Sequence, residues 1–462
     1  MEITLLPAWL TGAVAGIIRG FQKLKEMQLM PRSSVKPLTF IDAFAGCGGL
    51  SLGLMQAGLT GRFAIERDKF AFSTLKANLM GKDSRYKYAW PRWLPKEPVG
   101  IVELLHDYRE KLEELSGTVD VLVGGPPCQG FSAAGRRQHD DPRNQLFASY
   151  LNLVDIIKPK AVLIENVRGF TQNFVDGDEV KNFSQALKER LSGAYRVHEK
   201  LLNLSIFGVP QARTRYFILA LRLDLNAPDP FVHLQSRLPN FLRSLRLTAP
   251  VSSGAAISDL EVSRNGTRLS NESKGFQETC YSGPLTRYQK LMNAGCDVPT
   301  DLRLARHAEE ISGRFRAIID LSHAEGRLNT SIGAEMRARF GLKKMALRVL
   351  DPDRPSPTIT SMPDDLLHYS EARTLTVREN ARLQSFPDWY SFQGKYTTGG
   401  HRRKLEVPRF TQVANAVPPL VARAIGKTLT ELLKSGQAGT AATTISEPSL
   451  LHGAYQTPKV CS

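Results

Sequence analysis

Cysteine is scarce in this sequence, and its placement argues against two structural classes. The 462 residues include only five cysteines, with no Cys-x-x-Cys or Cys/His spacing. They are Cys47, Cys128, Cys280, Cys296 and Cys461. An odd, scattered set indicates neither a disulfide framework nor a zinc site, so we expect no metal and a reducing compartment.

Long apolar runs are also missing. The longest, residues 3–18, is shorter than the ~20 residues that cross a bilayer, and Pro7 interrupts it. No basic stretch precedes it, as a secretory signal would require. We therefore expect a helix or an extension there, and no membrane anchor. Residues 436–462 are rich in small and polar residues, which predicts a disordered tail.

Acidic residues are outnumbered. The chain has 45 Asp and Glu against 61 Lys and Arg, a formal charge of +16, so an anionic partner such as nucleic acid is expected. Residues 231–350 hold 18 basic and 11 acidic side chains, a net +7. A solvated surface explains this local charge as well as a domain that tracks phosphates does, so composition alone leaves both interpretations open.

An α/β pattern begins at residue 38. Short apolar runs at 39–43, 62–65, 119–123, 161–164 and 216–220 lack polar alternation, as parallel strands covered on both faces do. With the helical patterns between them, they predict a doubly wound α/β sheet. We expect an extension (1–37), the first part of this domain (38–222), a smaller irregular domain (223–365), a return to the first domain (366–435) and the tail (436–462).

A glycine turn follows the first predicted strand, in Phe40-Ile-Asp-Ala-Phe-Ala-Gly46-Cys-Gly-Gly49. Such a turn lets the backbone approach a nucleotide-like ligand, and Glu66, at the end of the next strand, can accept hydrogen bonds from ribose hydroxyls. Together they suggest an adenosyl cofactor. A simple packing role and a dinucleotide enzyme remain alternatives, although the spacing is not GxGxxG.

A cysteine stands on the loop that follows another predicted strand, in Gly124-Gly-Pro-Pro-Cys128-Gln129-Gly-Phe-Ser132. The carboxyl ends of strands face the ligand crevice of an open α/β sheet. A lone cysteine is usually a small buried hydrophobe, but prolines and glycines on both sides favour presentation toward a cleft. We interpret Cys128 as a nucleophile that needs nearby donors to become a thiolate.

Two further groups of charged residues follow predicted strands. Glu165 ends an apolar strand, where a carboxyl group is a candidate acid; a cap or an ion pair is the alternative. The segment Gln211-Ala-Arg213-Thr-Arg215 places two guanidinium groups on one face of an extended chain. That face would meet a phosphate or a carboxylate.

In this order, these blocks resemble the DNA (cytosine-5) methyltransferases. The segment Arg373-Thr-Leu-Thr-Val-Arg378-Glu379-Asn-Ala-Arg382-Leu-Gln384-Ser-Phe386-Pro387 and Gln412-Val-Ala-Asn415-Ala-Val-Pro-Pro419 are similar to two further family blocks, so the resemblance spans about residues 38–426. It implies a Rossmann-like catalytic domain (38–222 and 366–435) that uses S-adenosylmethionine, and a target recognition domain (223–365).

The resemblance also assigns roles to residues. Cofactor contacts fall on Phe44, Ala45, Gly46, Gly48, Gly49, Glu66, Arg67, Pro127, Leu146, Asn415 and Ala416. Catalytic roles fall on Cys128, Glu165, Arg213 and Arg215, and substrate contacts on Gln129, Ser132, Asn166, Val167 and Gln211. Cys128 would add to C6 of a flipped-out cytosine while Glu165 assists at N3.

The implied partner is double-stranded DNA, with a cognate restriction endonuclease in a restriction-modification system. We expect a monomer in the cytoplasm, associated with the nucleoid. A tRNA cytosine-5 methyltransferase and a non-catalytic DNA-binding member of the family are the alternatives. The long segment 223–365 favours DNA over tRNA, and the intact Cys128, Glu165 and paired arginines favour an enzyme.

Two positions depart from the family pattern. Ala414 stands where a glycine is common in the last block, which predicts a slightly bulkier turn next to Asn415. The stretch 98–103 shows no clear match to the block that usually offers an acidic residue near the adenine, and residues 90–98 are expected to be a surface insertion.

Overall fold

The computed structural model describes residues 36–126, 142–171, 174–176, 179–398 and 406–438. The chain divides at Pro37 into two units, and every described helix and strand belongs to the second, Leu38–Ser462. The predicted extension and tail lie almost wholly outside the described residues. Within the described ranges, no helix is both long and apolar enough to cross a membrane.

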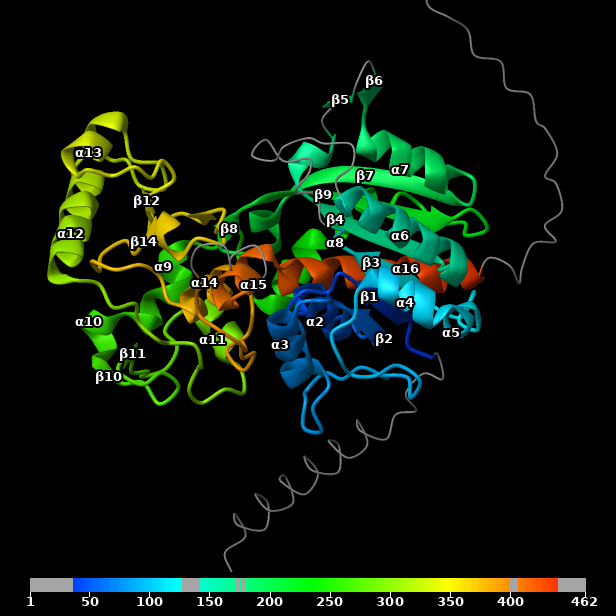
Figure 1. The fold of residues 1–462 in the computed structure, drawn as a ribbon, viewed down its shortest axis with the longest axis horizontal. Coiled ribbons are helices and arrows are strands. Elements are labelled where there is room, and N and C mark those ends of the chain that lie inside the picture. Colours follow the sequence, from blue (N-terminus) through cyan, green and yellow to red (C-terminus); the bar gives the residue numbers. More distant parts are fainter. Residues whose placement is uncertain (1–35, 127–141, 172–173, 177–178, 399–405, 439–462) are drawn as a thin grey trace, which may run out of the picture. The chain divides into compact units, whose positions relative to one another are not determined.

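A six-stranded sheet forms the centre of this unit (Figure 1). Its strands lie in the order β2-β1-β3-β4-β9-β7. Their bounds are β1 Thr39–Ala43, β2 Thr60–Ile65, β3 Val121–Gly124, β4 Ala161–Asn166, β7 Tyr195–Asn203 and β9 Thr214–Arg222. The first four are mutually parallel, and β1 lies between β2 and β3. The strand order therefore reverses beside β1, where an open α/β sheet forms its ligand crevice.

Side chains alternate across this sheet and fill a hydrophobic layer on each face. Phe40 of β1 joins one layer and Ile41 the other, and Val121 and Leu122 of β3 divide in the same way. The first layer packs under α2 (Gly49–Gln56), α3 (Lys69–Leu79), α8 (Pro230–Leu245) and α16 (Pro419–Ala438). The second packs under α4 (Ile101–Asp107), α5 (Arg109–Glu113), α6 (Pro142–Ile157) and α7 (Phe183–Ser192). The predicted doubly wound fold is confirmed.

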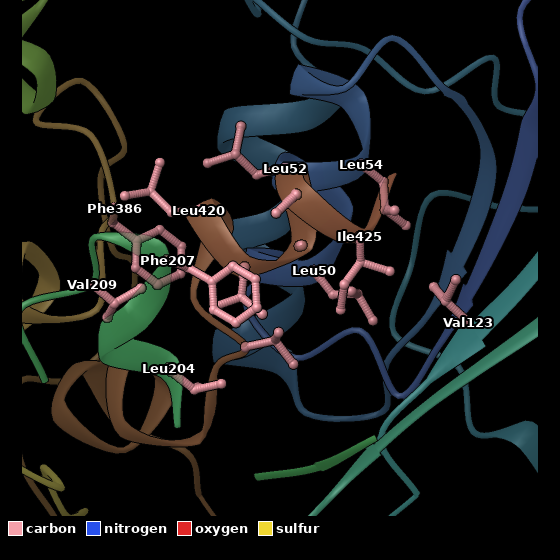
Figure 2. Close-up of a cluster of buried hydrophobic side chains, with 14 of the residues drawn as sticks. Leu50, Leu52, Leu54, Val123, Leu204, Phe207, Val209, Phe386, Leu420 and Ile425 are labelled. Carbon is pink, nitrogen blue, oxygen red and sulfur yellow. The ribbon is translucent and has the colours of Figure 1, made fainter. Parts of the chain in front are cut away.

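Helices α2 and α16 pack tightly although they lie at opposite ends of the described chain. Figure 2 shows Leu50, Leu52 and Leu54 of α2 together with Leu420 and Ile425 of α16, and all five side chains are buried. This helix pair brings the chain back onto the sheet after residue 366. It also fixes the position of the glycine turn that begins α2.

Two strands correct the expectation of an all-parallel sheet. Strand β9, expected to be parallel, runs antiparallel to both β4 and β7. Only residues 204–213 connect β7 to β9, including the short helix η2 (Leu204–Phe207), and a parallel crossover needs a dozen residues or more. Strand β7 was not predicted, because it is an edge strand with exposed or half-buried polar residues along most of its length.

Short elements replace the sheet after α8. They are α9 Ser253–Ile257, η3 Ser258–Leu260, α10 Val262–Asn265, β10 Thr267–Leu269, β11 Gln277–Thr279, α11 Arg287–Asn293, α12 Glu309–Ala324, α13 Ala334–Arg339, β12 Arg348–Val349, β13 Ser356–Pro357, η4 Pro363–Asp365 and β14 Leu366–Leu367. Helices α12 and α13 enclose a separate small core that includes Phe315, Ile318 and Met336. Helix α8, however, packs on α16 and shares the core of the sheet, and the bounds 223–365 of a second domain stay a prediction.

The remaining elements lie between and beside these parts. They are η1 Arg168–Thr171, β5 Phe174–Asp176, β6 Glu179–Lys181, β8 Gln211–Ala212, α14 Val377–Leu383 and α15 Arg409–Asn415. Strand β8 pairs with β13, so residues 211–212 are hydrogen-bonded to residues 356–357, near the end of the irregular region. Helix α14 starts with a capping box in which Thr376 and Glu379 bond reciprocally.

Candidate active site

A cavity of about 830 Å³ opens at the carboxyl ends of the parallel strands. Its wall contains residues that directly follow β1, β2 and β3 or end β4, together with the end of α15. Of the predicted residues, it is lined by Phe44, Ala45, Gly46, Glu66, Arg67, Leu146, Glu165, Asn166, Val167, Arg213, Arg215, Asn415 and Ala416. Parts of the sequence as far apart as 372 positions thus meet in one site.

The turn after β1 forms one side of the cavity. Phe44 and Gly46 have positive φ angles, +63° and +56°, and Phe44 is strained because it carries a side chain. The carboxylate of Glu66 holds this turn: its Oε2 accepts from Gly46 N at 2.9 Å and its Oε1 from Asp68 N at 2.7 Å. Burial raises the pKa of Glu66. The strained turn is therefore tied to the end of β2.

Three predicted contact residues do not line the cavity. Gly48, with φ +91°, and Gly49 lie beneath it, and a Cβ at Gly49 would approach Val417 O to 2.4 Å, so they allow close contact with neighbouring segments. Gln211 is fully buried; its Nε2 donates to Gln384 Oε1 at 3.0 Å and its Oε1 accepts from Ile359 N at 3.2 Å. In this structure the three residues pack against neighbouring segments, and their contacts with cofactor or substrate stay predictions.

A buried carboxyl group, Asp42 of β1, lies in the cavity wall. One oxygen accepts from the Ser51 hydroxyl, which also contacts the Tyr88 hydroxyl. The other, Oδ1, is buried and has no hydrogen-bond partner among the residues that the structure describes. Burial raises the pKa of Asp42 to about 7. Sequence reasoning missed this residue, because a lone aspartate inside an apolar strand gives no functional signal.

The opposite side of the cavity holds the predicted catalytic charges. Glu165, at the end of β4, forms an ion pair with Arg215 of β9, with Nε 3.1 Å from Oε1. Arg213 is buried, and its Nη1 donates to the carbonyl of Ala414 at 2.9 Å. Burial raises the pKa of Glu165, although Arg215 and Arg213 oppose the rise, and burial lowers the pKa of Arg213 to about 9. The group combines a carboxyl that retains a proton readily with two guanidinium groups.

The loop with the predicted nucleophile leaves the sheet beside Glu165. A Cβ at Gly125 would lie 3.5 Å from Glu165 Oε2, and Asn166 Nδ2 donates to the carbonyl of Pro126 at 3.2 Å. Both Gly125 and Pro126 line the cavity. Pro127, Cys128, Gln129 and Ser132 lie outside the described residues.

Sequence reasoning also missed one wall of the cavity, which residues 99–107 form. Val99 N donates to Glu66 O at 2.9 Å, and this bond places Gly100, Glu103, His106 and Asp107 of the following stretch in the wall. The short helix α4 carries no glycine turn or strand signal. The sequence shows no clear family match over 98–103, yet Glu103 of this stretch and Asp107 after it line the cavity.

Ala414 fits its place without distortion. It lies in α15, a helix whose seven residues need no positive φ, and its side chain is buried. Its carbonyl accepts from Arg213, so the expected bulkier turn is not seen. The next residue, Asn415, is exposed and lines the cavity.

This combination of a glycine turn, a strand-end carboxylate and a carboxyl–arginine group in one crevice defines a Rossmann-like methyltransferase site. Residues 38–431 match the model of the C-5 cytosine-specific DNA methylases. The chain belongs to this family, as its sequence blocks suggested, and is a DNA cytosine-5 methyltransferase.

Several known proteins are similar to the chain. The Type II methyltransferase M.DdeI of Desulfomicrobium norvegicum is 31% identical over 405 residues, which cover 84% of this chain and 88% of the relative. M.AgeI of Thalassovita gelatinovora is 31% identical over 454 residues, covering 84% and 98%. A crystal structure of a prophage-encoded candidate DNA modification methyltransferase from E. coli has a TM-score of 0.58 at 25% identity, covering 86% and 99%.

Proposed function

We propose that the enzyme methylates C5 of a specific cytosine in duplex DNA with S-adenosylmethionine as methyl donor, through a covalent bond between Cys128 and C6. One observation carries this proposal. One cavity is lined by the carboxyl groups of Asp42 and Glu66 and by the group of Glu165, Arg215 and Arg213. Gly125 and Pro126, which precede Cys128 in the sequence, line the same cavity. A cofactor and an extruded base would therefore meet within one enclosed space.

The cavity suits S-adenosylmethionine in size and charge. Ligand pockets range over about 300–1,000 Å³, and this one has about 830 Å³. The unpartnered Oδ1 of Asp42 offers a buried acceptor to a cationic group, and Glu66 and Asp107 add negative charge to the same wall. Phe44, Gly46, Glu66 and Asn415 would hold the cofactor. When bound, it supplies an electrophilic methyl group.

The chain's own residues would activate the cytosine. The thiolate of Cys128 forms a bond to C6, and the electron pair of the C5–C6 double bond makes C5 nucleophilic. Glu165, with its raised pKa, donates a proton or a strong hydrogen bond at N3, while Arg215 orients its carboxyl group. After methylation, the C5 proton goes to a base, the S–C6 bond breaks and the double bond re-forms.

The target base must leave the duplex, at a cost of a few kcal/mol, before C6 can be reached. We assign target recognition to the recognition segment, residues 223–365, whose residues 231–350 carry the net charge of +7. Phosphate contacts would supply much of the affinity and base contacts the specificity.

The relatives M.DdeI and M.AgeI are named Type II methyltransferases. We extend that class to this chain and propose that it protects host DNA as the partner of a cognate restriction endonuclease. It would act as a monomer on the chromosome in the cytoplasm.

Trapping with 5-fluorocytosine tests the mechanism. Fluorine cannot leave C5 as a proton does, so duplex DNA with this base should give a stable protein–DNA adduct on a denaturing gel when S-adenosylmethionine is present. The peptide that is bound to the DNA should contain Cys128, and the Cys128→Ala variant should give no adduct. Bisulfite sequencing of DNA from an expressing host would identify the methylated cytosine.

The outcomes separate the alternatives. Trapping on RNA but not on duplex DNA would replace the proposed substrate by tRNA. Methylation without trapping would remove the covalent step, and binding without methylation would indicate a non-catalytic family member.

A further inference from the structure

Three arginines and two aromatic rings form a continuous stack beside the cavity. The guanidinium carbon of Arg303 lies 4.1 Å from the ring centre of Phe276 and 3.6 Å from that of Tyr396. Arg306 lies 4.4 Å from the Phe276 ring, and Arg409 4.2 Å from the Tyr396 ring. The stack thus joins two parts of the recognition segment to the segment that carries α15.

Only one of these arginines is neutralised. Arg409 Nη1 contacts Asp301 Oδ1 at 2.7 Å and Glu272 Oε2 at 3.0 Å. Among the described residues, no ion pair includes Arg303 or Arg306, and Arg303 Nε is buried without a hydrogen-bond partner. Arg306 is exposed. The stack therefore presents uncompensated positive charge at its Arg306 end.

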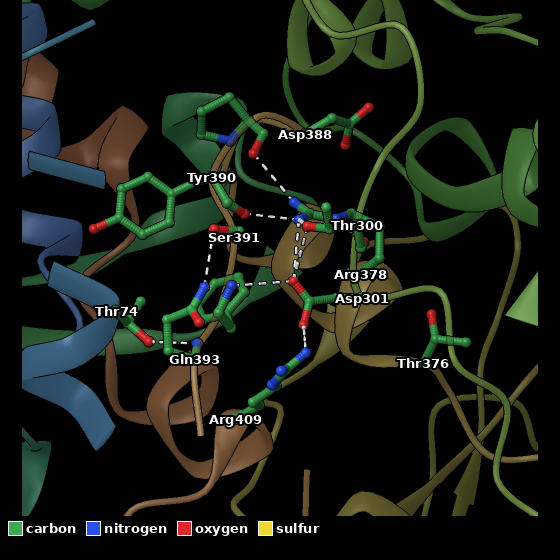
Figure 3. Close-up of polar contacts among 12 residues, drawn as sticks. Thr74, Thr300, Asp301, Thr376, Arg378, Asp388, Tyr390, Ser391, Gln393 and Arg409 are labelled. Atoms are coloured by element: carbon green, nitrogen blue, oxygen red, sulfur yellow. Dashed lines mark hydrogen bonds and ion pairs between the residues drawn. The ribbon is translucent and has the colours of Figure 1, made fainter. Parts of the chain in front are cut away.

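The inner end of the stack is firmly anchored. Figure 3 shows Asp301 between Arg409 and Arg378, and Phe392 N also donates to Asp301 Oδ2 at 3.1 Å. Arg409 begins α15, and Asn415 at the other end of this helix lines the cavity. Six residues of helix rise by about 9 Å, so the Arg409 end of the stack lies about this far along α15 from a residue of the cavity wall.

We infer that Arg306 and Arg303, held by Phe276 and Tyr396, form a preformed contact for a backbone phosphate of the DNA duplex near the flipped cytosine. This inference rests on the proposed function and adds a binding site to it. The ligand is the phosphodiester group, so the contact carries no sequence information.

The stack explains why arginine suits this role. A guanidinium group that lies flat on a ring keeps its N–H groups at the edge free for a phosphate, which a lysine ammonium would not do. The rings also restrict the side chains before binding, so less conformational entropy is lost when the phosphate arrives. The nearby acidic groups, Glu272 and Asp301, form their ion pairs with Arg409, and neither forms an ion pair with Arg306 among the described residues.

The salt dependence of DNA binding tests this contact. Binding of the full-length protein to a fluorescein-labelled duplex of random sequence would be followed by anisotropy from about 50 to 250 mM NaCl. We expect Arg306→Gln to reduce the slope of log K against log salt by about one and to weaken binding several-fold at low salt. Its thermal unfolding should match the wild type, because Arg306 is exposed and makes no ion pair with a described residue.

Arg243→Gln is the matched control. Arg243 is also an exposed arginine, but it lies on α8, where its Nη1 donates to Asn240 Oδ1 at 3.1 Å. Its slope should equal the wild-type slope. An unchanged slope for Arg306→Gln would overturn the inference and leave the stack as a structural clamp. Failure of the wild type itself to bind or methylate DNA would instead contradict the proposed function.

Discussion

Apolar side chains fill both faces of the sheet, whereas buried arginines join the recognition segment to helix α14. Arg382 pairs with Asp259 at 3.0 Å and with Asp388 at 2.5 Å, and all three side chains are fully buried. Arg378 pairs with Asp301 and donates to the carbonyls of Pro387 and Tyr390. Between helices α2 and α16, which cover one face of the sheet, the apolar side chains of Leu50, Leu52 and Ile425 make the contact.

Apolar contacts and buried ion pairs differ in how strictly they fix the relative orientation of two segments rather than in how strongly they stabilise the fold. Apolar contacts reward any arrangement that fills the volume, but a guanidinium–carboxylate pair requires one relative orientation of the two segments. Buried pairs often add little net stability, because the ions lose their hydration. Our hypothesis is that the arginines of α14 fix the orientation of the recognition segment, while the sheet supplies stability and carries the reacting groups.

The largest effect is expected where the chemistry lies. Glu165→Gln should lower kcat by about 10²–10⁴-fold, because the proton at N3 is lost, while the Kd for DNA changes less than about threefold. Since the pKa of Glu165 is raised, the wild-type rate should fall as pH rises through that pKa and the carboxyl loses its proton. Single-turnover methylation and anisotropy would measure both quantities. Equal losses in rate and affinity would indicate a structural carboxylate instead.

The next effect tests the buried ion pairs of Arg378 and Arg382, which form an ionic junction between helix α14 and the recognition segment. Arg382→Met should lower the free energy of unfolding by about 3–5 kcal/mol, because Asp259 and Asp388 remain buried without their cation. Their pKa values would rise in the folded variant, so protonation relieves part of the loss. The difference from the wild type should therefore shrink as pH falls from about 8 to about 5.

Leu52→Ala provides the apolar control for that variant. It should cost about 2–5 kcal/mol in urea unfolding, and the cost should not vary with pH, because no charge is exposed or left unpaired. If the two variants showed the same pH dependence, the proposed contrast between the regions would be wrong.

The sheet could be predicted because its signals are local. Strands β1 and β4 are mostly apolar and show no polar alternation, and the carboxyl groups of Glu66 and Glu165 stand directly at strand ends. Strand β7 lacks such a run, since exposed or half-buried polar residues occupy most of its length. The helix-borne cavity residues, such as Asp107, also lack a local pattern that points to a ligand.

The ionic junction could not be predicted for a different reason. Arginine normally lies at the surface, whereas Arg378 and Arg382 are both fully buried. Their partners Asp259 and Asp301 are distant in sequence, 123 and 77 positions away. No periodicity links residues so far apart, and the stack of Arg303 with Phe276 and Tyr396 is invisible for the same reason.

A smaller effect concerns Asp42 in the cavity wall. Its folded-state pKa of about 7 lies above its ordinary value of 3.8, so charged Asp42 becomes populated only as pH rises toward 7. The affinity for the cationic cofactor should rise by about tenfold between about pH 5.5 and 7.5, and Asp42→Asn should remove this rise. Calorimetric titration with S-adenosylmethionine measures it. Parallel profiles for the two proteins would show that Asp42 does not meet the cofactor.

The same raised pKa has a consequence for stability. Between about pH 4 and pH 7 the folded protein holds a proton on Asp42 that the unfolded chain releases, so stability falls as pH rises through this range. The Asp42→Asn variant lacks that contribution and should lose less stability over the same range. Urea unfolding at several pH values separates this effect from the binding of cofactor.

The smallest effect is expected for Ala414→Gly, which restores the residue common in the family block. Ala414 lies inside α15 with ordinary helical geometry, so glycine gains nothing from its freedom at positive φ and costs about 1 kcal/mol of unfolding free energy. The carbonyl that binds Arg213 belongs to the backbone and remains. We therefore expect kcat/KM to change less than about twofold. A large gain in activity would mean that the methyl group of Ala414 holds Arg213 or Asn415 away from its best position. The active-site residues at the sheet edge would then be packed less favourably than the apolar residues beneath them.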